Sequence, residues 1–226
     1  MARKFLKLVA NLAAAKTTNM LDALKAFCVE SVTRFNTIPR ERQEQLYALA
    51  TLLQSLESRK LIFICTHNSR RSHFGQIWSQ IAAHYYGVVN VQTYSGGTEA
   101  TAFHPNAIAA LARAGCRIQD TSSGPNPRYE VLFDEKTPGM QCFSKVYNHP
   151  SNPSTDFVAI MTCNAADEAC PIVQGASHRY ALTYLDPKLS DGTETETNVY
   201  DERCQQIATE MLFLFSLIQQ KTTSGV

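Results

Sequence analysis

A cysteine and an arginine six positions apart are the residues of this chain best suited to covalent chemistry. Cys65 begins a short polar loop, and Arg71 and Ser72 end it. The thiolate is the reactive form of cysteine, and both a guanidinium and a helix N-terminus stabilise it. An arginine fork binds two oxygens of a tetrahedral oxyanion, and the N–H groups of a curved loop bind the others. The pattern therefore predicts a sulfur nucleophile that faces a bound oxyanion. The substrate-binding residues expected besides Arg71 are Thr66, His67, Asn68, Ser69, Arg70 and Ser72.

The segments on either side of this loop predict how it is held. Residues 61–64 are four consecutive apolar residues. Such a run is too short for a helix and indicates a buried strand of a parallel sheet. From Ser72 onward, apolar residues recur at helical spacing. The loop should therefore join the carboxyl end of a strand to the N-terminus of a helix, which is where open α/β sheets bind ligands.

The rest of the chain alternates between predicted strands and predicted helices. Further strands are expected at residues 88–94, 157–161 and 180–185, and helices at about 104–115 and 198–220. This alternation predicts an α/β fold with a four-stranded parallel sheet wound on both faces.

Two segments do not follow this alternation. Residues 1–58 predict helices that form an N-terminal extension, packed either on the catalytic domain of residues 59–226 or on a second subunit. Residues 121–156 are irregular and rich in turns, which indicates an insertion near the rim of the active site. Within it, residues 128–133 and 142–147 are expected to pair as a hairpin across the turn Thr137-Pro138-Gly139.

The composition argues against several classes of protein. With 226 residues, 44% of them hydrophobic, the chain can bury a full core. A net charge of +1 gives no reason to expect nucleic acid or an anionic membrane as a partner. Seven cysteines without a framework spacing favour reduced thiols in a cytoplasm over structural disulfides. The first 15 residues only faintly imitate a secretory signal, and residues 211–218 are too short to span a bilayer. We expect no metal site.

Asp186 is the candidate for a general acid. With Pro187 it follows the last predicted strand, so its carboxyl group should lie at the same sheet edge as Cys65. A carboxyl group that is sheltered from water near an oxyanion can stay protonated and protonate a departing oxygen. An Asp-Pro pair is also an ordinary turn signal, and the residues alone leave both interpretations open.

Cys163 and Cys170 suggest a redox role. The strand expected at residues 157–161 places Cys163 at the same edge, and a helix-prone polar segment separates it from Cys170. A helix would hold the two thiols about 10 Å apart. A disulfide needs Cα atoms within about 7 Å, so this segment would have to unwind for the pair to form one. The alternative is that both cysteines are simply buried small apolar residues.

Taken together, these motifs resemble those of two related families. Over residues 59–220 the chain resembles the low-molecular-weight protein tyrosine phosphatases and the thioredoxin-coupled arsenate reductases, which share one fold. The set of three cysteines favours the reductases, and Asp186 occupies the position of the acid in both families. The motifs that carry the resemblance are Cys65 to Ser72, Tyr94-Ser95-Gly96-Gly97 followed by Glu99, Pro105-Asn106-Ala107-Ile108, Cys163 with Cys170-Pro171, and Asp186-Pro187.

The resemblance to the reductases implies a sequence of thiol steps. Cys65 attacks arsenate held by the loop and Arg71, and Asp186 protonates the departing oxygen. Cys163 then attacks Cys65, which releases arsenite and leaves a Cys65–Cys163 disulfide. Cys170 displaces Cys65, and thioredoxin reduces the resulting Cys163–Cys170 disulfide.

Two other functions remain open. One is hydrolysis of phosphotyrosine through a phosphocysteine at Cys65, for which Tyr129, Tyr147 and Tyr184 are candidate aromatic residues at the rim. The other is a non-catalytic module that binds phosphate or a phosphoprotein.

The chain also departs from the pattern of these families. His67 and Arg70 replace a glycine and a small residue or cysteine, which adds positive charge at the mouth of the loop. Gln76 replaces an acidic residue that helps to hold potassium in some relatives, so bound potassium is doubtful, and no other cofactor is expected. The families generally lack the 1–58 extension and the 121–156 insertion.

Overall fold

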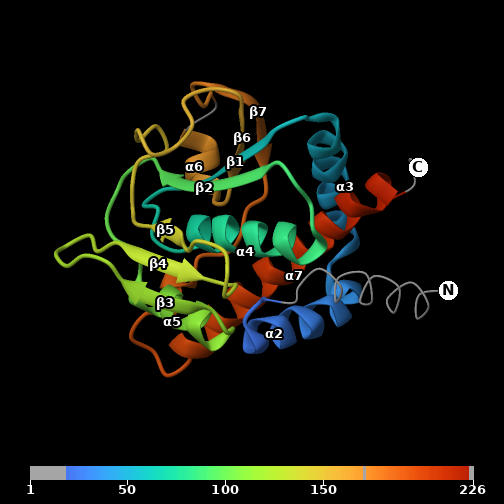
Figure 1. The fold of residues 1–226 in the computed structure, drawn as a ribbon. Coiled ribbons are helices and arrows are strands. Elements are labelled where there is room, and N and C mark those ends of the chain that lie inside the picture. Colours follow the sequence, from blue (N-terminus) through green and yellow to red (C-terminus); the bar gives the residue numbers. More distant parts are fainter. Residues whose placement is uncertain (1–18, 170–171, 224–226) are drawn as a thin grey trace.

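The computed structural model of the protein describes residues 19–169 and 172–223, and its centre is a four-stranded parallel sheet (Figure 1). The strands lie in the order β2-β1-β6-β7, and every neighbouring pair is parallel. They are β1 (Arg59–Cys65), β2 (Val91–Gly97), β6 (Phe157–Met161) and β7 (Ala176–Ala181). The predicted α/β fold with four parallel strands is therefore confirmed.

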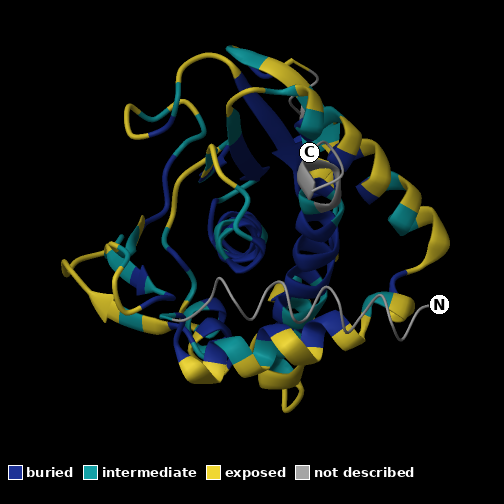
Figure 2. Cartoon of the chain, turned by 45° about the vertical axis from the view of Figure 1, so that its right-hand side comes forward, coloured by how far each residue is buried: buried dark blue, intermediate teal, exposed yellow. Residues whose placement is uncertain are grey.

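Helices cover both faces of this sheet because successive side chains of a strand point to opposite faces. Leu61 and Phe63 of β1 pack in the larger apolar core, together with residues of α4 (Arg71–Tyr86), α5 (Pro105–Arg113) and α7 (Glu196–Thr223). Ile62 and Ile64 pack in a second, smaller core, together with a residue of α6 (Asn164–Ala169). Figure 2 shows the inner strands β1 and β6 and the helix beneath them as mostly buried, whereas the edge strand β7 has no buried residue.

The N-terminal helices share the larger core. They are α2 (Asp22–Thr33) and α3 (Arg40–Ser55), joined by the short 3-10 helix η1 (Phe35–Thr37), and both lie against α7. Leu24, Leu46 and Leu49 are fully buried in that core. Arg42 of α3 also forms an ion pair of 2.8 Å with Glu210 of α7, whose side chain is 2% exposed. In this structure the helices of the extension therefore pack on the α/β part of the same chain.

A small antiparallel sheet stands beside the parallel one. Its strands are β3 (Arg117–Asp120), β4 (Tyr129–Leu132) and β5 (Met140–Cys142), in the order β3-β4-β5. The expected hairpin is present, since β4 and β5 pair across the turn at residues 137–139, although both strands are shorter than predicted. The pairing of β3 with β4 was not predicted. After β5 the chain returns to the parallel sheet, where Val146 forms a parallel bridge with Gly97.

Two strand boundaries differ from the expectation. The strand expected at residues 88–94 begins only at Val91, because Gly87 ends α4 in a left-handed conformation and the Val88 N–H still bonds to the helix carbonyl of Ala83. The last strand was expected at residues 180–185 but is β7, which begins four residues earlier. β7 is an edge strand, so its polar residues are tolerated and give no alternating apolar signal. Asp186 therefore does not directly follow this strand.

Two expectations concern residues outside this description. The first 15 residues and Cys170 lie outside the described residues. No helix in the described part of the chain has the length and apolar character needed to cross a membrane.

Candidate active site

The loop between β1 and α4 forms a closed turn around the Cys65 sulfur. The Ser72 hydroxyl lies 3.0 Å from the Cys65 Sγ, and the Asn68 side-chain amide donates to the same hydroxyl at 2.9 Å. Asn68 has a φ of 44°, a left-handed conformation that asparagine tolerates better than most residues. These contacts connect the middle of the loop to the sulfur through one hydroxyl group.

Groups outside the loop bind its carbonyl oxygens. The Thr66 carbonyl accepts from the Glu99 N–H at 2.8 Å, the His67 carbonyl from the Ser144 hydroxyl at 2.9 Å, and the Ser69 carbonyl from the His104 N–H at 2.9 Å. Among the described residues, none accepts a bond from the backbone N–H groups of residues 66–70. The loop therefore keeps a set of free donors, which is the arrangement that binds a tetrahedral oxyanion.

A cleft of about 330 Å³ opens beside this loop and brings three of the predicted residues together. Arg71, Cys163 and Asp186 all line it. The Arg71 guanidinium donates through Nη2 to the Asp186 carboxylate at 2.5 Å and through Nη1 to the Tyr184 carbonyl at 2.9 Å. The other oxygen of Asp186 accepts from the Lys188 N–H at the start of the 3-10 helix η2 (Pro187–Ser190). An oxyanion that binds the Arg71 guanidinium through both nitrogens must therefore displace the Asp186 carboxylate from it.

Cys163 lies at the same edge of the sheet as Cys65. β1 and β6 are neighbouring parallel strands with Ile64 opposite Met161, so both cysteines leave the sheet side by side. The Cys163 sulfur is 3.5 Å from the Thr66 hydroxyl and accepts the N–H of Ala166 in α6 at 3.3 Å. The six cysteines among the described residues are free thiols. The predicted helical segment after Cys163 is α6.

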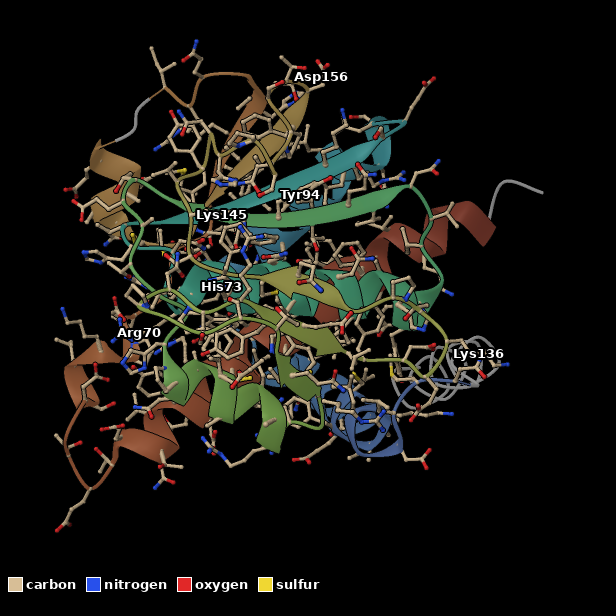
Figure 3. All side chains as sticks on the ribbon, turned by 60° about the vertical axis from the view of Figure 1, so that its left-hand side comes forward. Arg70, His73, Tyr94, Lys136, Lys145 and Asp156 are labelled. Carbon is tan, nitrogen blue, oxygen red and sulfur yellow. The ribbon has the colours of Figure 1, made fainter. Side chains whose placement is uncertain are left out.

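The Arg70 guanidinium is directed to a different set of partners. Its Nη2 donates to the Asp191 carboxylate at 2.8 Å and its Nε to the Tyr200 hydroxyl at 2.5 Å. Figure 3 shows Arg70 on the side of the molecule where the last helix begins. This side chain therefore anchors the segment that follows Asp186. Asp191 and Tyr200 were not predicted, because an Asp-Gly pair and a helical tyrosine carry no motif of their own.

His67 remains at the surface of the loop. Its Nε2 is 3.6 Å from the Glu99 carboxylate, and both side chains are largely exposed. His67 and Glu99 therefore form only an exposed contact, of a kind that stabilises weakly.

Two buried basic residues behind the loop were also missed by sequence reasoning. His73 is fully buried, stacks on Phe103 with ring centroids 3.9 Å apart, and lies 3.3 Å from the Ser95 hydroxyl. Burial, together with the nearby charge of Lys145, holds the pKa of His73 well below its usual value, so its ring is neutral. Lys145 is 5% exposed, and burial lowers its pKa to about 8. Neither residue belongs to a recognisable motif, because the burial of both side chains results from tertiary packing alone.

Gln76 lies in a groove that also contains a buried basic residue. Gln76 and Lys145 both line this groove, so an alkali ion beside Gln76 would meet a charge of the same sign. Among the described residues, no group of three or more histidine, cysteine or acidic side chains is arranged to hold a metal ion.

The remaining cysteines belong to the core. Burial raises the pKa of Cys28, Cys142 and Cys204 to about 12 and also raises the pKa of Cys116, so these thiols stay protonated at neutral pH. Tyr184, one of the aromatic residues expected at the rim, is buried with its ring beneath the Arg42 guanidinium.

Comparison with known proteins gives relatives of one kind by sequence. No protein-family model matches the chain. The arsenate reductase of Bacillus subtilis strain 168 is 28% identical over 148 residues, which are 66% of this chain and 88% of that protein. The arsenate reductase of Bacillus licheniformis is 27% identical over 161 residues, which are 71% of this chain and 97% of that protein.

Among solved structures, a low-molecular-weight phosphotyrosine phosphatase from Vibrio cholerae O395 matches 75% of this chain and 100% of its own, with a TM-score of 0.47 and 13% identity. The arsenate reductases matched by sequence are enzymes. The resemblance expected from the sequence is thereby confirmed, and over about two thirds of its length this chain is similar to bacterial arsenate reductases.

Proposed function

We propose that this protein is an arsenate reductase that uses Cys65, Cys163 and Cys170 as a thiol relay and a dithiol protein of the thioredoxin class as its reductant. The observation that carries this proposal is the cleft beside the anion loop, where Arg71, Asp186 and a second cysteine, Cys163, meet. The similarity to arsenate reductases over nearly their full length supports the same substrate.

The first step forms a bond between sulfur and arsenic. The free N–H groups of the loop and the Arg71 fork bind the oxygens of arsenate and place its central atom over the Cys65 sulfur. The Ser72 hydroxyl, 3.0 Å from this sulfur, donates a hydrogen bond that stabilises the thiolate. As the sulfur attacks, one arsenate oxygen leaves as water and takes its last proton from Asp186.

Asp186 can supply that proton only after it separates from Arg71. In the resting protein the two side chains are 2.5 Å apart, so the Arg71 guanidinium occupies the carboxyl group that must deliver the proton. When the guanidinium turns to the oxyanion, the carboxylate loses its counter-ion next to a bound anion and gains a proton. Substrate binding thus leads to protonation of Asp186, which can then act as the general acid.

The second step transfers two electrons to arsenic, and the third step moves the resulting disulfide away from Cys65. The Cys163 thiolate attacks the Cys65 sulfur, a sulfur–sulfur bond forms, and the electron pair of the sulfur–arsenic bond stays on arsenic, which leaves as arsenite. The Cys170 thiolate then attacks Cys163, which frees Cys65 and forms a Cys163–Cys170 disulfide. The reductant's dithiol reduces that disulfide and is itself oxidised.

The relay separates this proposal from phosphatase activity. The Cys163→Ser variant should lose thioredoxin-coupled arsenate turnover and keep any slow hydrolysis of an aryl phosphate, because hydrolysis needs Cys65 but no second thiol. Cys116→Ala, which removes a buried thiol of the larger core that does not line the cleft, is the matched control and should keep both activities. Full arsenate turnover by Cys163→Ser would refute the relay, and efficient aryl phosphate hydrolysis without arsenate turnover in the unmodified protein would favour a phosphatase.

A further inference from the structure

Lys145 carries a buried ammonium behind the anion loop. The residue is 5% exposed, its Nζ lies 4.7 Å from the centre of the Phe143 ring, and the Phe143 carbonyl at 3.4 Å is its one hydrogen-bond acceptor among the described residues. No carboxylate in the described part of the chain lies within 4 Å of it. Figure 3 shows Lys145 near the end of β2, with His73 close by on α4.

The segment that carries this ammonium is joined to the anion loop by hydrogen bonds. The Lys145 N–H donates to the Asn68 side-chain oxygen at 2.9 Å, and Asn68 donates in turn to Ser72, which contacts the Cys65 sulfur. On the other side, the Gly97 N–H donates to the Lys145 carbonyl at 2.9 Å. The position of Lys145 relative to the loop is therefore fixed by its own backbone.

The groups around Lys145 do not neutralise its charge. On α4 the His73 ring is neutral and Gln76 is an amide, and the Cys142 thiol of β5, with its pKa raised to about 12, stays protonated. The Arg128 guanidinium lies 4.2 Å from the centre of the Phe143 ring and adds a second positive charge. Tyr94 of β2 and His84 also line the groove, and His84 is already paired with Asp134.

Two neutral acceptors in the groove that Lys145 lines also lack partners. The side-chain oxygens of Gln76 and Asn152 are buried without a hydrogen bond, and both residues line the same groove as Lys145. This surface therefore offers amide oxygens and no negative charge to the ammonium. A buried cation without a counter-ion is costly, and it is tolerated where an anion is bound nearby.

We propose that Lys145 is a positioning residue whose ammonium acts as a built-in cation behind the loop and strengthens the binding of the oxyanion. With this ammonium in place, the protein should bind oxyanions without an added alkali ion. The inference rests on the proposed function, because it requires that the loop binds a tetrahedral dianion. Charges separated by protein interior are weakly screened, so the ammonium acts on the anion without touching it.

The test measures sulfate binding by calorimetry in the Cys65→Ser background, at pH 6.5 and pH 9.5. Sulfate keeps the same charge at both values, and the serine removes the titration of the thiol. With Lys145 present, affinity should fall by about tenfold or more as the pH rises through about 8, where the ammonium loses its proton. Lys145→Met and Lys145→Gln should bind sulfate as weakly at pH 6.5 as the Lys145 protein does at pH 9.5.

The Lys145→Arg variant provides the decisive rescue. A guanidinium stays protonated at both pH values, so this variant should bind sulfate tightly at pH 9.5 and lose the pH dependence. Lys136→Met, which removes an exposed lysine of the same 121–156 segment, is the matched control and should change nothing.

The outcomes distinguish this inference from the proposed function. If the Lys145→Met and Lys145→Gln proteins keep the affinity and the pH profile of the Lys145 protein, the inference is wrong while the anion loop stands. A sulfate affinity that is raised by potassium chloride over choline chloride at equal ionic strength would also overturn it. If the Cys65→Ser protein with Lys145 binds no sulfate at either pH, the anion loop itself is refuted and both proposals fall.

Discussion

Replacing Asp186 with asparagine should tighten the binding of an oxyanion and slow its turnover at the same time. In the resting protein, Asp186 holds the Arg71 guanidinium at 2.5 Å, and the two side chains are 30% and 12% exposed. An oxyanion must break this ion pair before both guanidinium nitrogens of Arg71 can bind it. A charge-assisted hydrogen bond contributes about 1 to 2 kcal/mol at such a partly exposed site, between the values for buried and for exposed charged pairs. The asparagine variant should therefore bind sulfate about five- to thirtyfold more tightly.

The same substitution removes the proposed acid. Arsenate turnover should fall by about 10²- to 10⁴-fold, the range typical of a lost general acid. Asp156→Asn is the matched control, because Asp156 is exposed and its φ of 58° is a conformation that asparagine tolerates. Sulfate affinity is measured by calorimetry and arsenate turnover in single-turnover kinetics. Unchanged or weaker sulfate binding by Asp186→Asn would refute the exchange of Arg71 between the carboxylate and the oxyanion.

Three further predictions concern Arg71, Lys145 and Arg42. Arg71→Lys should weaken sulfate binding measured by calorimetry by about tenfold, because lysine cannot make the forked contact; equal affinity would contradict the role of the fork. In the unmodified protein, the sulfate concentration needed to protect Cys65 from alkylation should rise by about tenfold as the pH rises through about 8, because sulfate binding favours the protonated form of Lys145, whose pKa is lowered to about 8; an unchanged protecting concentration at pH 9.5 would contradict this sign. Arg42→Met should reduce the free energy of unfolding by about 3 kcal/mol in urea titrations, because it leaves the buried Glu210 carboxylate without its partner; a loss below 1 kcal/mol would show that the pair does not hold α3 to α7.

The sequence was sufficient to predict the parts of the site that are local in the chain. Cys65, Arg71 and Ser72 are linked by one strand, one loop and one helix. Their spacing along the chain therefore determines how they lie relative to one another. Cys163 could be placed because a fully buried strand, β6, precedes it, and strands of that kind read clearly as apolar runs.

The parts that depend on tertiary packing could not be predicted. Lys145 and Ser144 reach the loop because the chain after β5 crosses back to β2, and nothing in their own neighbourhood indicates that return. The early residues of β7 are polar because its outer edge is free, which removed the apolar pattern on which the prediction depended. Hydrogen bonds from Leu182 to Met161 and from Tyr184 to Thr162 continue the pairing of β6 beyond β7, which explains why Asp186 still reaches the cleft.

Arg70 shows how a correct motif can mislead about one side chain. Its place in the loop predicts a contact with the oxyanion, but its guanidinium bonds to Asp191 and Tyr200. The residue caps the start of α4 with a φ of −135°, so its side chain leaves the loop in another direction from that of Arg71. Local spacing fixes the backbone of such a loop more firmly than the direction of each side chain.

The most direct test of the relay is a single turnover of the Cys170→Ser variant with arsenate, followed by acid quench and mass spectrometry of the digested protein. Without the third thiol, the reaction should stop after the second step. We predict one arsenite released per chain and a disulfide between Cys65 and Cys163. Release of arsenite without that disulfide, or a disulfide that joins other cysteines, would contradict the proposed order of attack.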